Sequence, residues 1–168
     1  MIKTELIERK VTIKSLLDFY DLDKVEGYCK NCENYNQIWS CPGHDFNPYD
    51  YLSQFDTAHL YALKIYLPEG ADKDQVLEIF QNERRAFSDK LMTKEEETVA
   101  LIAGNCYQCE TCERLYNRPC RLKDKMRYSL ESLGLKVGDI TSDLMGIELK
   151  WSKGGKGDYL VTVGALLK

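Results

Sequence analysis

The sequence predicts an α/β protein with a mixed sheet of about four strands, flanking helices and a cysteine-rich lobe at one edge of the sheet. Residues 57–67 and 159–167 are apolar on both faces, as buried strands are. An amphipathic segment of helical period follows the first of these runs. The seven cysteines are not scattered but lie in two tight groups, which predicts a separate cysteine-bearing part of the fold.

Length and charge limit the organisation and the partners. A chain of 168 residues suits one buried core, so we expect a single domain over residues 1–168 with cysteine-rich segments 28–44 and 104–121. The net charge of −4 argues against a nucleic-acid partner, because phosphates attract clustered positive charge. The sequence shows neither a signal-peptide pattern nor a run of membrane-spanning length, so we expect a cytoplasmic protein without membrane contact. The residues do not specify an oligomeric state.

The first half of the chain predicts two short helices. Ile13, Leu16, Leu17 and Tyr20 recur at helical spacing in residues 11–20, with Thr12 as the N-cap. Asn47 followed by Pro48 predicts the start of a second helix over residues 49–55.

Residues 57–103 predict a β-α-β unit with parallel strands and a right-handed crossover. Asp72 and Gln75 form a capping-box pattern at the start of a helix of about twenty residues. Its inner face is predicted to contain Leu77, Phe80, Arg84, Phe87 and Leu91. The apolar residues 98–103 then predict the second strand.

The remaining elements are predicted from periodicity and breakers. Residues 122–133 suggest a helix that ends at Gly134, followed by a short strand over 136–139 and a helix over 141–150. Residues 151–158 are glycine-rich but lack the Gly-Lys-Ser/Thr ending of a phosphate loop, so we interpret them as a flexible connection before strand 159–167.

The second cysteine group has the spacing of an iron–sulfur site. Cys106, Cys109 and Cys112 stand at Cys-x2-Cys-x2-Cys, and Cys120 follows after seven residues. Zinc usually takes its ligands from two separated knuckles, whereas three successive cysteines wrap a cubane and a distant one completes it. We therefore predict a 4Fe–4S cluster; zinc and structural or disulfide-bonded cysteines are the alternatives.

The first group, Cys29, Cys32 and Cys41, offers one thiolate fewer than a fully ligated cubane requires. A cluster held by these three cysteines would leave one iron open to a small molecule. His44 lies at knuckle distance from Cys41, so a Cys3His zinc site is the competing interpretation. A fourth ligand from elsewhere, or no metal, is also possible. Because residues 104–112 begin where the second predicted strand ends, we expect Cys41 and Cys106 to face each other at one edge of the sheet.

The order Cys-x2-Cys-x8-Cys-Pro, then Gly-x-Cys-x2-Cys-x2-Cys-x7-Cys-Arg and Gly-x-x-Val, resembles a prokaryotic family of predicted metal-binding proteins common in anaerobes. The resemblance covers residues 25–150 and implies iron–sulfur binding, but it implies no reaction.

Three functions are consistent with these residues. One is a redox module with one or two 4Fe–4S clusters that passes electrons to a partner protein. Another is an enzyme whose three-cysteine cluster activates a small-molecule substrate. The third is a zinc-stabilised binding module.

Overall fold

The structure, a computed structural model, describes residues 1–148 and 158–168. Four strands form one sheet in the order β1-β2-β4-β3, and each neighbouring pair is antiparallel. These strands are β1 (Thr4–Thr12), β2 (Thr57–Tyr66), β3 (Val99–Leu101) and β4 (Tyr159–Leu167). The predicted α/β class with about four strands is confirmed, but the prediction of a mixed sheet is wrong, because every neighbouring pair of strands is antiparallel.

The segment from β2 to β3 differs from a simple β-α-β unit. Both strands are antiparallel to β4, so they run in the same direction, as predicted. However, β4 lies between them, and they share no hydrogen bonds. The difference arises because β4, apolar on both faces, takes the buried position between β2 and β3.

The strand β1 was not predicted. Its charged residues at positions 5, 8, 9 and 10 obscure the two-residue alternation, and most of its side chains are exposed at the edge of the sheet. The helix expected over 11–20 is shorter: α1 spans Ile13–Leu17, with the Thr12 side chain capping it as predicted.

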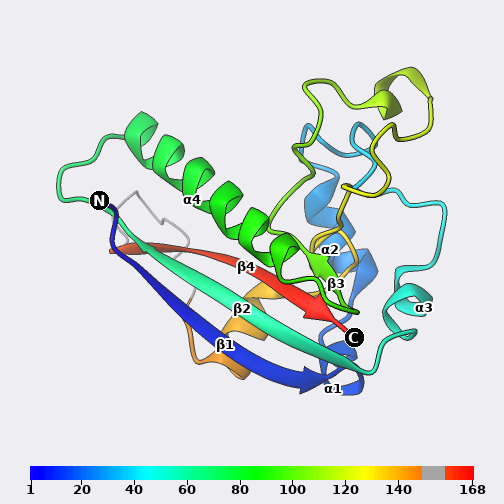
Figure 1. The fold of residues 1–168 in the computed structure, drawn as a ribbon, viewed down its shortest axis with the longest axis horizontal. Coiled ribbons are helices and arrows are strands. Elements are labelled where there is room, and N and C mark those ends of the chain that lie inside the picture. Colours follow the sequence, from blue (N-terminus) through cyan, green and yellow to red (C-terminus); the bar gives the residue numbers. More distant parts are fainter. Residues whose placement is uncertain (149–157) are drawn as a thin grey trace.

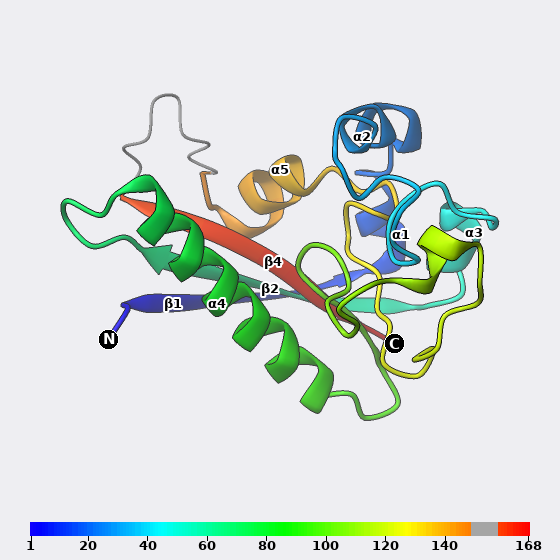
Figure 2. The same ribbon diagram turned by 90° about the horizontal axis from the view of Figure 1, so that it is seen from above.

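The sheet separates two hydrophobic clusters, and Figures 1 and 2 show α4 (Lys73–Thr93) on one face and α5 (Val137–Asp139) on the other. On the α4 side, Phe87 and Leu91 pack against Tyr61 and Leu166. The larger cluster covers the opposite face; its members include Ile13, Leu16, Leu52, Leu60, Leu130, Leu133, Leu135, Ile140, Val163 and Leu167. Alternate residues of β2 and β4 therefore supply both cores.

The helix α4 begins with the predicted capping box of Asp72 and Gln75. Its inner face is shorter than predicted, because Leu77 is 54% exposed while Phe87 and Leu91 are buried. The first turns of α4 therefore extend past the core. The helix α3 (Pro48–Leu52) begins after the Asn47 cap as predicted, whereas α2 (Leu22–Cys29), capped by Asp21, was not predicted.

The helix predicted over residues 122–133 is wrong. Residues 121–125 form a turn, and the carbonyl of Tyr128 accepts a hydrogen bond of 2.9 Å from the Ile102 amide, which extends the edge of β3. Leu130 and Leu133 belong to the apolar residues whose spacing of four, four and three suggested a helix. Separate turns of the chain bury them instead. Gly134 does adopt the predicted left-handed conformation, at φ +83°, but it closes a single turn.

The strand predicted over residues 136–139 is also wrong. A helical segment begins there instead and comprises α5 and the π-helical η2 (Ile140–Leu144). The predicted helix over 141–150 is thus displaced towards the N-terminus, and its last two residues lie outside the described residues. The predicted connection over residues 151–158 also lies outside them, except for Asp158. In residues 1–148 and 158–168, no helix has the length and apolar character to cross a membrane.

Candidate metal centre

The four-cysteine segment leaves the sheet at the end of β3. Gly104, at φ +73°, turns the chain, and an added Cβ there would collide with Nη1 of Arg84 from α4. Two residues later, the Cys106 amide donates a 2.9 Å hydrogen bond to Oγ of Ser40, a side chain that is 1% exposed. The backbone of the first cysteine is therefore held on two sides.

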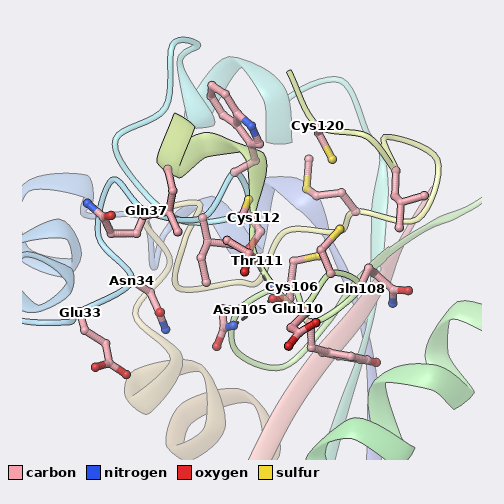
Figure 3. A pocket seen from close by; sticks show the side chains of 18 of the residues that line it. Glu33, Asn34, Gln37, Asn105, Cys106, Gln108, Glu110, Thr111, Cys112 and Cys120 are labelled. Atoms are coloured by element: carbon pink, nitrogen blue, oxygen red, sulfur yellow. Dashed lines mark hydrogen bonds between the residues drawn. The ribbon is translucent and has the colours of Figure 1, made fainter. Parts of the chain in front are cut away.

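Cys106, Cys109, Cys112 and Cys120 line one cavity of about 630 Å³. Figure 3 shows Cys106 and Cys112 below the yellow-green 3-10 helix η1 (Glu113–Tyr116), with Cys120 to one side of it. The opposite wall comes from the other cysteine-rich segment, through residues 33, 34 and 37–40. The cavity is far larger than a single water molecule, which occupies about 30 Å³ in the liquid.

The first cysteine group lies on α2 and the turns that follow it. The helix ends at Cys29, the exposed Cys32 lies one turn beyond, and Cys41 follows the buried Ser40. Burial is the main cause that raises the pKa of Cys41, and Cys32 and Cys29 raise it further.

The two cysteine-rich segments pack directly against each other, and Arg114 of η1 makes four hydrogen bonds across the interface between them. Its Nη1 donates to the carbonyls of Ile38 and Cys41, at 2.9 and 2.8 Å. Its Nη2 donates to the Gly43 carbonyl and to Oδ1 of Asn36, at 2.6 and 3.0 Å. Together with the Ser40 contact to Cys106, this confirms that the segments bearing Cys41 and Cys106 face each other.

Further contacts support the same interface. Nε1 of Trp39 donates to the Arg118 carbonyl at 2.9 Å, and the Arg114 guanidinium lies 5.0 Å from the Trp39 ring centre. The exposed side chains of Arg118 and Arg121 instead approach Glu113, at 3.6 and 3.2 Å. Arg114 thus joins the two segments, whereas the other two arginines lie at the rim.

The environment of these thiols disfavours free thiolates. Burial is the main cause that raises the pKa of Cys106 and of Cys29, and it raises that of Cys41 to about 11. Neighbouring cysteines raise these pKa values further. A bound cation would supply the positive charge that such a cluster of thiolates lacks, and would replace the protons.

His44 lies in an aromatic cluster. Its Nε2 donates to the Ser132 carbonyl at 2.8 Å, and its ring stacks on Phe46 with centres 4.7 Å apart and meets Tyr128 edge-on. Burial lowers its pKa, which favours the neutral ring. Packing and one hydrogen bond therefore account for His44, and its role as a zinc ligand stays a prediction.

All seven cysteines are free thiols, so the structure contains no disulfide framework. Among the described residues, no three His, Cys, Asp or Glu side chains converge closely enough to hold a single metal ion. Four cysteines of one segment line one cavity, and four thiolates, one for each iron, is the number that a 4Fe–4S cluster would require.

Sequence reasoning missed two residues near the cysteines. Ser40 positions Cys106, but a serine before a cysteine gives no signal of that contact. Oε2 of Glu131 is buried and has no hydrogen-bond partner in residues 1–148 and 158–168. Glu131 stands next to the core residue Leu130, but a single acidic residue there gives no signal of burial.

The fold is that of an α/β protein in which two cysteine-rich segments pack against each other. Residues 19–167 match the model of the family described as predicted metal-binding protein (DUF2284), and the chain belongs to this family. No curated protein and no solved structure matches the chain.

Proposed function

We propose that the protein binds a 4Fe–4S cluster at Cys106, Cys109, Cys112 and Cys120 and transfers electrons to or from a partner protein. The observation that carries this proposal is the single cavity lined by these four thiols. When bound, such a cluster supplies a one-electron store at a potential set by its charge, hydrogen bonds and exposure.

The surrounding residues suit that role. The four cysteines are partly exposed, which brings the cluster position close to the surface where a partner docks. Arg118 and Arg121, exposed at the rim, favour an acidic partner surface. Ser40 and Arg114 hold the two walls of the cavity together through hydrogen bonds. The chain thus keeps the ligands in place with little rearrangement when the charge of the site changes.

A second metal group at Cys29, Cys32 and Cys41 belongs to the same proposal. Cys32 is exposed, so a group held at these three cysteines would be accessible to small molecules. That accessibility supports the second candidate function, an enzyme in which this group binds and polarises a small substrate.

The test is anaerobic purification, analysis of iron, sulfide and zinc, and EPR of the reduced protein. A redox module gives a reduced-cluster signal that titrates reversibly and is lost in Cys109→Ser. A signal that changes when small ligands are added favours the enzyme. Stoichiometric zinc without sulfide contradicts both and leaves a zinc-stabilised binding module.

A further inference from the structure

The strand β1 forms an open edge of the sheet. It stands at one end of the order β1-β2-β4-β3, as Figure 1 shows, and among the described residues no strand pairs with its outer side. Its register with β2 runs without interruption from Thr4 to Thr12. The opposite edge is shorter, because β3 has three residues and the Ile102 amide beyond it donates to the Tyr128 carbonyl at 2.9 Å. A long edge strand such as β1 presents unpaired backbone groups to another chain.

The hydrogen bonds at the two ends of β1 show which backbone groups point outward. The Tyr66 amide donates to the Lys3 carbonyl at 2.9 Å. At the other end, the Ile13 amide donates to the Asp56 carbonyl at 2.9 Å. Both contacts continue the register between β1 and β2, so the odd-numbered residues of β1 direct their backbone groups towards β2. The amides and carbonyls of the even-numbered residues therefore point to the open edge; these residues are Thr4, Leu6, Glu8, Lys10 and Thr12.

Charged side chains often protect an edge strand from another chain, so the charges of β1 decide whether a second copy fits there. A twofold axis perpendicular to a joined sheet places side chains of the same face opposite each other. An axis at Glu8, Arg9 or Lys10 would set two like charges opposite each other. An axis at Ile7 instead sets Glu5 opposite Arg9 on both sides of the axis and brings no like charges together. Axes nearer the ends of the strand pair fewer residues.

The side chains on this face are available for such a contact. Arg9 is exposed and has no ion pair in residues 1–148 and 158–168. Glu5 contacts its neighbours through Oε2, which accepts a 2.7 Å hydrogen bond from the Tyr66 hydroxyl and lies 4.0 Å from Nζ of Lys64. A carboxylate has a second oxygen that can accept from a guanidinium. At the axis, the half-buried Ile7 already packs against the larger hydrophobic cluster, and contact with its copy would extend that cluster.

We propose that β1 pairs with β1 of a second copy of this chain, antiparallel and centred on Ile7, so that two four-stranded sheets join into one. In this register, Thr4 faces Lys10 and Leu6 faces Glu8. Their backbone groups point outward, so each pair would exchange two N–H···O hydrogen bonds. The contact uses the same surface on both copies and therefore closes at a dimer. This inference goes beyond the proposed function and does not depend on a bound metal.

The test is sedimentation equilibrium of the full chain, with far-ultraviolet circular dichroism as the check on folding. The wild type is expected to dimerise. Arg9→Glu and Glu5→Arg each place two pairs of like charges across the axis, so each is expected to raise the dissociation constant by about tenfold or more. Lys10→Glu is the matched control, because residue 10 faces Thr4 in this register, and it should dimerise like the wild type. A monomeric wild type, or a wild-type dissociation constant in Arg9→Glu, would overturn the proposal.

Two further measurements test the register and the backbone contact. In an equimolar mixture of Arg9→Glu and Glu5→Arg, one chain carries two glutamates and the other two arginines, so opposite charges meet again at both contacts. The mixture is expected to regain the wild-type dissociation constant; a mixture that stays monomeric contradicts the register. Leu6→Pro removes an amide hydrogen that points away from β2, so it should be monomeric with the circular dichroism of the wild type. A dimer of Leu6→Pro with wild-type affinity would contradict pairing through this edge.

Discussion

Arg114 provides the sharpest test of how the two cysteine-rich segments depend on each other. Its guanidinium makes four hydrogen bonds to the backbone and side chains of residues 36–43. A hydrogen bond to a charged group contributes about 1.5–3 kcal/mol, but such contributions are not additive and water replaces part of them after truncation. We therefore expect Arg114→Ala to lower the free energy of unfolding by about 2–4 kcal/mol.

The assay is urea unfolding together with metal content, and Arg118→Ala is the matched control. Arg118 comes from the same segment, its side chain is 68% exposed and its nitrogen lies 3.6 Å from Glu113, so its loss should cost less than about 1 kcal/mol. Arg114→Lys keeps the charge but lacks the planar guanidinium, so its loss of unfolding free energy should lie between those of Arg114→Ala and Arg118→Ala. Arg114→Ala must also reduce metal at both cysteine groups. If it unfolds like Arg118→Ala and keeps all its metal, the two segments do not depend on this contact.

Three other outcomes are expected. Cys112→Ser should remove metal from the four-cysteine site and leave the far-ultraviolet circular dichroism of the sheet and α4 unchanged; loss of that spectrum would show that the metal holds the whole fold. Gly104→Ala should destabilise the protein by about 1–3 kcal/mol in urea unfolding, because the alanine would be strained in the left-handed conformation and would displace Arg84. Wild-type stability of this variant would contradict the close contact between Gly104 and Arg84. Glu95 accepts two 2.7 Å hydrogen bonds from Arg127, which hold its folded pKa below that of a free carboxyl. Its contribution to stability is therefore complete above about pH 4.3 and lost as pH falls through the folded pKa, so Arg127→Met should flatten the acid side of a urea-midpoint profile between pH 7 and pH 3. An unchanged profile would remove Glu95 as a cause of acid sensitivity.

The elements predicted correctly are those whose signals are local. The capping box at Asp72, the Asn47–Pro48 helix start and the strands at 57–66 and 159–167 depend on a few adjacent residues or on apolar runs. The wrong helix at 122–133 shows the limit of this approach. Its apolar spacing is helical, but tertiary pairing of Tyr128 with the edge of β3 decides the backbone, and no local pattern shows that partner.

For the candidate site, too, the features with a local signal could be predicted from the sequence, whereas the contacts between distant residues could not. Cysteine spacing identified the seven thiols, and the position of residues 104–112 after a strand predicted that the groups would meet. The residues that hold the groups together could not be predicted, because Arg114 acts across 73 positions of sequence from Cys41, and Ser40 acts across 66 positions from Cys106. Their roles arise from how the turns pack, and an arginine or serine in a loop has the same local appearance when it is merely solvated.

The central claim is that four thiols at the end of β3 surround an inorganic iron–sulfur group. It is tested most directly by the ratio of acid-labile sulfide to iron in the anaerobically purified protein, measured beside the variant Cys109→Ser. The account predicts sulfide and iron in about equal amounts, with about four fewer of each per chain in the variant. Iron or zinc bound without sulfide, or a variant that keeps the full wild-type content, would contradict it.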